Sequence, residues 1–296
     1  MENRSNFVTV VRPGTLTTFQ DSGRPGLAHL GVPRSGALDL KSYNLANRLV
    51  GNQAGTAVLE TTFDGVSLAF SSGAIIAVTG ALANVTVNDQ AVGWSLPIYV
   101  PEGGCLNVGA ATVGLRTYVA VASGFQVKAV LDSRSRDLLS GLGPPPLVAN
   151  QQIEIGPSST SAPFIDFAPY APLGDSLTLT VHPGPRRDWL TNKGEHDLFH
   201  QQYQVLPESN RIALRLKGNP IERRHHGELA SEALVWGAIE LLPTGDTVVF
   251  LSDHPTTGGY PVVGVVDDTS ASLCAQLRSG DKVSLSQARS WRTFEA

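Results

Sequence analysis

Residues 66–89 read VSLAFSSGAIIAVTGALANVTVND, and this stretch shows the pattern from which the class of fold is predicted. It holds three short apolar runs rich in β-branched residues, each followed by turn-forming residues. The runs are Val66–Phe70, Ile75–Thr79 and Val85–Val87, and the turn residues are Gly73, Gly80 and Asn88-Asp89. Short strands at close spacing, each ended by a turn signal, are typical of sandwiches and barrels. The stretch therefore predicts a mainly β fold.

The same pattern continues on both sides of this stretch. The 30 glycines and 19 prolines are spread along the chain, as frequent turns between short strands require. Further strands are predicted at Phe7–Val11, Leu16–Phe19, Ile98–Val100, Thr117–Val121, Leu177–Val181, Gln204-Val205, Ile212–Leu216, Val248–Leu251, Val262–Val266 and Lys282–Leu285.

Three short segments are predicted to be helical. In the clearest, residues 40–50, Asp39 can cap the first turn and Gly51 can end the helix. The other two are Arg187–Gln202, interrupted near Gly194, and Ala271–Leu277.

Length and composition indicate a globular protein of two domains. The chain has 296 residues, of which 42% are hydrophobic, and a domain usually holds about 100–200 residues. The segment Ser158–Asp175 is rich in serine, alanine and proline, as in a connector. We therefore expect an N-terminal β lobe over residues 1–172 and a C-terminal β lobe over residues 173–296.

Charge and cysteine content argue against several classes of function. The formal net charge of −4 gives no drive toward nucleic acid or anionic membrane. Cys105 and Cys274 lie far apart and outside any CxxC spacing, which indicates reduced thiols rather than disulfides or a zinc site. No apolar run approaches the length of a membrane span, and Met1–Ser5 leads into no secretory signal. We expect a cytoplasmic protein that binds no metal, nucleic acid or membrane.

The densest cluster of polar and glycine residues is the segment 250–261, FLSDHPTTGGYP, which lies between two predicted strands. It supplies two groups that can transfer protons, and five positions that can hold a substrate through hydroxyl or backbone N–H donors. They are Asp253 and His254 for proton transfer, and Thr256, Thr257, Gly258, Gly259 and Tyr260 for substrate binding. The alternative is a hairpin loop in which Asp and Thr side chains satisfy their own turn.

Two other segments offer groups for an anionic substrate. Arg24 can bind a carboxylate, although it can instead pair with Asp21. Ser35 lies shortly before the first predicted helix, where backbone N–H groups can bind an anion. Arg211 opens a predicted strand in which basic residues alternate with leucines, so a solvated strand face is its alternative.

Together, several segments resemble one family. They are VRPG (11–14), QDSGRPG (20–26), GVPRSGALD (31–39), ANRLVGN (46–52), LE (59–60), VTGA (78–81), SE (231–232), GAI (237–239) and DHPTTGGYP (253–261). This order is similar to the biotin-dependent carboxyltransferase family, which includes the C subunit of 5-oxoprolinase, allophanate hydrolase subunit 2, the KipI antagonist and the carboxyltransferase region of urea amidolyase. The resemblance covers about residues 8–286. The chain departs from the family pattern at Ala213 and Ala233, where glycines are usual, and at Pro144–Pro146.

The resemblance implies a cyclophilin-like β-barrel architecture in two lobes, with a few short helices. It also implies a partner, the KipI-like protein (allophanate hydrolase subunit 1), and a further LamB/YcsF-type protein in the 5-oxoprolinase system. The assembled complex would use ATP to open 5-oxoproline, a small amide, to glutamate, and this chain would bind no cofactor covalently. The first alternative is an allophanate hydrolase or urea carboxylase-type carboxyltransferase, with biotin on a separate carrier. The second is a non-catalytic regulator that binds a KipI-like protein.

Overall fold

The computed structural model describes residues 6–157, 168, 176–227 and 229–289. The chain clusters into two compact units. Unit 1 comprises Met1–Arg24, Ser35–Asp137 and Gly141–Pro172, and unit 2 comprises Pro25–Arg34, Leu138–Ser140 and Leu173–Ala296. The expected lobe boundary at residues 172–173 lies outside the described residues, as does the predicted connector apart from residue 168. Both units are built from strands with a few short helices, so the predicted mainly β fold is confirmed.

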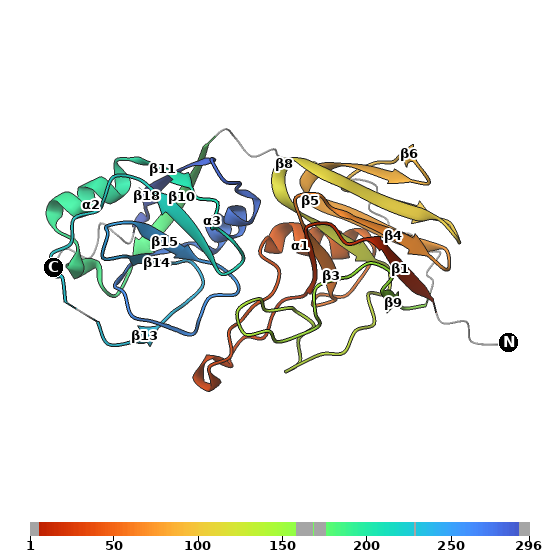
Figure 1. Ribbon diagram of the computed structural model, residues 1–296, viewed down its shortest axis with the longest axis horizontal. Helices are drawn as coiled ribbons and strands as arrows, with labels where there is room; N and C mark the ends of the chain where they lie inside the picture. Colours follow the sequence, from red (N-terminus) through yellow and green to blue (C-terminus); the bar gives the residue numbers. More distant parts are fainter. Residues whose placement is uncertain (1–5, 158–167, 169–175, 228, 290–296) are drawn as a thin grey trace. The chain divides into compact units, whose positions relative to one another are not determined.

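Unit 1 is built on a nine-stranded antiparallel sheet (Figure 1). Six strands follow one another across it in the order β2 (Leu16–Gln20), β3 (Val58–Thr62), β8 (Cys105–Val121), β4 (Val66–Phe70), β1 (Phe7–Arg12) and β9 (Gln152–Glu154). The remaining strands are β5 (Ala74–Val87), which pairs with β8, and β6 (Gln90–Ala91) and β7 (Pro97–Val100), which pair with β5. The buried side chains of this sheet form the main apolar core of the unit.

One long strand replaces two predicted short ones. Ile75–Thr79 and Val85–Val87 both belong to β5, so the predicted turn at Gly80 is wrong. Gly80 has φ +89°, and a Cβ there would lie 2.4 Å from the carbonyl oxygen of Arg116. The register with β8 shifts directly after it. The glycine therefore allows a bulge in a continuous strand rather than a reversal of the chain.

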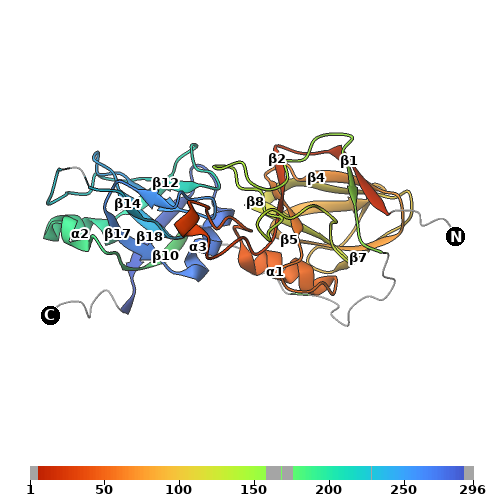
Figure 2. The same ribbon diagram turned by 90° about the horizontal axis from the view of Figure 1, so that it is seen from below.

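Helix α1 (Leu40–Leu49) lies against β5 and β8 (Figure 2). Its buried apolar side chains belong to the same cluster as those of the two strands. The Asp39 carboxylate accepts a hydrogen bond from the Ser42 N–H at 3.0 Å, which caps the first turn. At the other end Gly51 adopts φ 72°, and its N–H and the next one bond to carbonyls of the last turn. This is a Schellman ending. The predicted helix and both of its end signals are confirmed.

Unit 2 is a closed seven-stranded barrel. Its strands run around the barrel in the order β10 (Ser176–Pro183), β17 (Val262–Val266), β14 (Ala238–Leu241), β15 (Thr247–Phe250), β12 (Ala213–Lys217), β11 (Gln202–Val205) and β18 (Lys282–Gln287). A parallel pairing of β10 with β18 closes the barrel, and the other pairings are antiparallel. Outside the barrel, β13 (Glu232–Ala233) and β16 (Thr257–Gly258) form a two-stranded sheet.

The helices of unit 2 are interrupted at other residues than predicted. The segment predicted as one interrupted helix consists of η2 (Arg187–Trp189) and α2 (Asn192–Phe199). The break falls before Thr191, which caps α2 by accepting a hydrogen bond from the Gly194 N–H at 2.9 Å. Gly194 itself lies inside α2, where a Cβ would come within 2.2 Å of the Glu222 carbonyl oxygen.

The third predicted helix also divides, into α3 (Asp268–Leu273) and η3 (Cys274–Gln276). It begins earlier than predicted, because Asp267 caps it through the Ser270 N–H. A further short helix, η1 (Ala28–Leu30), was not predicted. The remaining predicted strands are found within two residues of their expected ends, except Thr117–Val121, which is the last part of the much longer β8.

Candidate functional site

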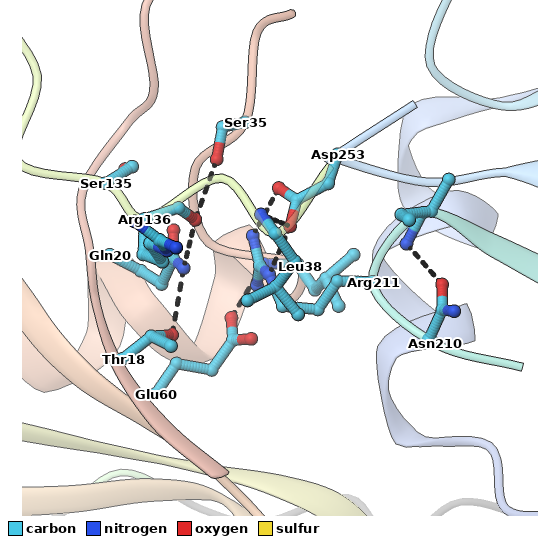
Figure 3. Close-up of polar contacts among 12 residues, drawn as sticks. Thr18, Gln20, Ser35, Leu38, Glu60, Ser135, Arg136, Asn210, Arg211 and Asp253 are labelled. Atoms are coloured by element: carbon cyan, nitrogen blue, oxygen red, sulfur yellow. Dashed lines mark hydrogen bonds and ion pairs between the residues drawn. The ribbon is translucent and has the colours of Figure 1, made fainter. Parts of the chain in front are cut away.

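Arg211 and Asp253 form a buried ion pair in unit 2 (Figure 3). Arg211 precedes β12 and Asp253 follows β15, and these strands are neighbours in the barrel. Nε and Nη2 of the guanidinium each donate to a carboxylate oxygen at 2.9 Å. The side chains are 1% and 0% exposed. This bidentate geometry is the strong form of an arginine–carboxylate contact.

The Arg211–Asp253 pair fixes the start of the loop 253–260. The backbone N–H of Leu138 also donates to Oδ2 of Asp253, at 3.0 Å, and this oxygen accepts from Nε of Arg211 as well. Asp253 therefore holds the loop to Arg211 and to residue 138, rather than only satisfying its own turn. Arg211 is buried and lies outside β12, whereas Arg215 and Lys217 within that strand are exposed. The solvated-face alternative thus holds for the strand but not for Arg211.

The rest of the loop has a buried beginning and an exposed tip. His254 is buried, and its Nδ1 lies 2.7 Å from the Pro255 carbonyl oxygen. A carbonyl can only accept, so Nδ1 carries the hydrogen and Nε2 is the proton-accepting nitrogen of the neutral ring. Thr257 and Gly258 form β16, and Gly259 and Tyr260 are exposed. Thr256 is half-buried and its carbonyl accepts from the Leu234 N–H.

Glu240, on β14, is a carboxylate that the sequence motifs do not single out. Its neighbours across the barrel surface are Val248 and Val262, and it is buried. Burial raises the pKa of Glu240 to about 6, while a hydrogen bond from the Tyr260 backbone N–H acts in the opposite direction. Its carboxylate lies directly against Gly258, where a Cβ would come within 2.1 Å of Oε1. The only signal for it in the sequence is one acidic residue within the apolar run 238–242.

Arg24 and Ser35 lie in unit 1, and both bind the same segment of that unit. Nη2 of Arg24 donates to the Ser135 carbonyl at 2.6 Å. Oγ of Ser35 donates to the Arg136 carbonyl at 3.1 Å (Figure 3). Both side chains are buried. Asp21, the alternative partner of Arg24, accepts hydrogen bonds from Ser133, from Ser135 and from the backbone N–H of residue 134. These contacts fix the loop around residue 135.

The described residues offer little support for a metal site, a membrane-spanning helix or a reactive cysteine. Within the described ranges, no group of three or more His, Cys, Asp or Glu side chains is placed to hold a metal ion. Nor does any helix among these residues have the length and apolarity needed to cross a membrane. Cys105 and Cys274 are free thiols, as predicted, and burial raises the pKa of Cys274 to about 12. Such a thiol is a packed side chain rather than a nucleophile.

Comparison with known proteins gives consistent matches over nearly the whole chain. A family model described as carboxyltransferase domain, subdomain A and B, matches residues 30–287. The C subunit of 5-oxoprolinase from Escherichia coli (strain K12) is 31% identical over 282 residues, which is 94% of this chain and 90% of that protein. A urea amidolyase of Lachancea kluyveri is 32% identical over 93% of this chain but only 16% of its own length.

A solved structure gives the same result for the fold. The crystal structure of the K. lactis urea amidolyase superposes with a TM-score of 0.88 and 28% identity. The match covers 96% of this chain and 19% of that one, so the chain corresponds to about a fifth of that larger protein.

Proposed function

Since this chain belongs to the carboxyltransferase domain family (subdomains A and B), we propose that it is the C subunit of an ATP-dependent 5-oxoprolinase. In this role it acts with a KipI-like protein and a LamB/YcsF-type protein to open 5-oxoproline to glutamate. The observation that carries the proposal is the extent of the match to the E. coli protein, 94% of this chain and 90% of that one. ATP is assigned to the assembled complex and to no residue of this chain.

The loop 253–260 is the segment to which we assign the substrate. Opening a lactam ring requires polarisation of its carbonyl and delivery of a proton to its nitrogen. Thr257 and Gly259 are exposed, and Gly258 between them is half-buried. We assign to the Thr257 hydroxyl and to the N–H groups of the two glycines the polarisation of a carbonyl or the binding of a carboxylate. Thr256 and Tyr260 flank these donors and complete the binding segment.

Of the predicted site residues, Asp253 and Arg211 bind each other, so in this assignment His254 takes the proton-transfer role. Its Nδ1 donates to the Pro255 carbonyl, which fixes the ring and leaves Nε2 as the basic nitrogen. Asp253 supports it from the preceding position by holding the loop to Arg211. We retain Arg24 and Ser35 as proposed substrate-binding residues of unit 1, where their contacts order the segment around residue 135.

A carboxyltransferase acting on a urea-type amide is the second candidate. It is favoured by the 32% identity to urea amidolyase and by the TM-score of 0.88 to its structure. In this reaction carboxybiotin, carried by another protein or domain, is a substrate. Its carboxyl group leaves the biotin nitrogen and forms a bond to an amide nitrogen. The amide nitrogen loses a proton, and the biotin nitrogen gains one. The same hydroxyl and N–H donors suit that carboxylate.

Reconstitution tests the proposal. The chain is combined with its KipI-like and LamB/YcsF-type partners, and ATP-dependent formation of glutamate from 5-oxoproline is measured alongside carboxylation of urea by carboxybiotin. Turnover of 5-oxoproline alone supports the first function, and carboxylation alone supports the second. A stable complex that performs neither reaction would refute both and indicate a regulatory binding protein. Co-elution in size-exclusion chromatography reports the complex, which should bury more than about 1,000 Å².

Matched histidine variants test the assignment within the loop. His254→Gln should lower turnover by about 10²–10⁴-fold, as expected for loss of a general acid or base. His182→Gln, at an exposed position of β10, is the control and should leave turnover unchanged. Equal turnover of the two variants, each still bound to the KipI-like partner, would contradict the role of His254.

A further inference from the structure

We propose that Glu240 is a positioning residue whose proton controls the loop Thr256–Tyr260. The importance of this loop for the reaction rests on the proposed function, but the contact between Glu240 and the loop does not. Glu240 lies beneath the loop and acts through its backbone. Protonated, it lets the loop lie over it as described, and ionised, it drives the loop toward a conformation in which water reaches the carboxylate.

The setting of Glu240 is unusual for a carboxylate. The residue is 4% exposed, and Ala238, Val248 and Val262 around it belong to one apolar cluster on the barrel. In the described part of the chain, its Oε1 is a buried atom with no hydrogen-bond partner. A buried, ionised oxygen in such a place is costly unless it gains a donor or the group takes up a proton.

The loop forms the cover over this carboxylate. Gly258 lies so close that a Cβ would come within 2.1 Å of Oε1 and 2.8 Å of a methyl carbon of Leu234. The Tyr260 backbone N–H donates to the carboxylate. Gly258 belongs to β16, which pairs with β13, so a second strand holds this part of the loop. Glycine at position 258 is therefore what allows the loop to close over Glu240.

Two carboxylates on the segments around Glu240 are held in ion pairs with arginines. Glu232 on β13 is bound by Arg186, and Asp253, which precedes the loop, is bound by Arg211. His254 also precedes the loop, and Tyr260 ends it. Neither β15 nor β17 contains a titratable residue. Burial is the main cause of the raised pKa of Glu240, and no charge on the described residues contributes to it. The proton on Glu240 therefore reports whether the loop covers it.

The size and sign of the effect follow from linkage. With the loop closed the pKa of Glu240 is about 6, against an ordinary value of 4.5. A conformation that hydrates the carboxylate restores the ordinary value, so it binds the proton more weakly. The ratio of open to closed loop should therefore rise by up to about 30-fold as the pH increases from below 4.5 to above 6.

Hydrogen exchange of the full chain tests this without substrate or partner. Exchange at the backbone amides of residues 256–260 is measured from about pH 4 to 8 and corrected for the intrinsic pH dependence of exchange. In the wild type the opening constant should rise by about 30-fold, with its midpoint between pH 4.5 and 6. Glu240→Gln should abolish the rise, and the exposed Glu208→Gln should keep it. A rise that persists in Glu240→Gln, or no rise in the wild type, would overturn the proposal.

A second variant keeps the proposal testable if Glu240→Gln does not fold. Gly258→Ala forces the loop away from Oε1, so its opening constant should be high at every pH and lack the step. A wild-type step retained in Gly258→Ala would refute the proposed contact. Because exchange needs no turnover, a failed 5-oxoproline assay with an intact exchange step removes the proposed function and leaves this inference standing. In an active complex, Glu240→Gln should flatten the pH dependence of KM and leave kcat unchanged.

Discussion

Replacing Asp253 with asparagine should lower the free energy of unfolding by about 3–5 kcal/mol. The magnitude follows from the geometry of the pair. Arg211 and Asp253 are 1% and 0% exposed, and both N–H···O contacts are 2.9 Å. Asparagine keeps the shape of the side chain but presents a neutral amide to the guanidinium. Arg211 then remains buried opposite a group that cannot balance its charge, and its burial keeps solvent from compensating.

The matched control is the exposed ion pair of Lys217 and Asp246. Its N···O distance is also 2.9 Å, but the side chains are 54% and 27% exposed, so Asp246→Asn should cost less than about 1 kcal/mol. Urea unfolding followed by tryptophan fluorescence measures both variants, because Trp189 and Trp236 lie in unit 2. The double variant Arg211→Met/Asp253→Leu should recover most of the loss. An Asp253→Asn cost no larger than that of Asp246→Asn would refute the reasoning.

Two further changes test how local contacts stabilise the helices. Asp39→Ala removes the cap that Ser42 donates to and should cost about 0.5–2 kcal/mol in chemical denaturation; no measurable loss would show that the cap is dispensable. Gly194→Ala should gain about 1 kcal/mol if helix propensity dominated. The 2.2 Å approach of the new Cβ to the Glu222 carbonyl oxygen instead predicts a loss of about 1–3 kcal/mol, and a raised Tm would contradict this.

Sequence patterns predict structure best where that structure depends on residues close to one another in the chain. Helix α1 has its cap at Asp39 and its ending at Gly51, and both signals act within one turn of the helix. The turn predicted at Gly80 is wrong because the role of this glycine depends on β8, a strand far along the chain. Gly80 pairs with Thr117 of β8, and the Arg116 carbonyl leaves no room for a Cβ. A positive φ at glycine is common to turns and bulges, so the sequence alone could not distinguish them.

In the candidate site too, contacts between residues that are distant in the chain could not be predicted from the sequence. The segment 253–260 is recognisable from its composition and its family resemblance, and it does form a loop between barrel strands. The burial of Arg211 is not predictable from the sequence. Strand alternation continued back from β12 would place it on the face of the exposed Arg215 and Lys217. Glu240 escapes prediction because its position beneath Gly258 arises only when β14 and the loop meet in the folded barrel.

The parallel closure of the barrel has a consequence for biosynthesis. β10 pairs with β18, which lies about a hundred residues later in the chain, and β18 also pairs with β11. While the ribosome translates the intervening residues, β10 and β11 each present an edge that β18 will later cover. Such edges can pair with other chains. The barrel of unit 2 therefore closes only when β18 emerges, and a nascent chain stalled before β18 leaves the edges of β10 and β11 open to aggregation.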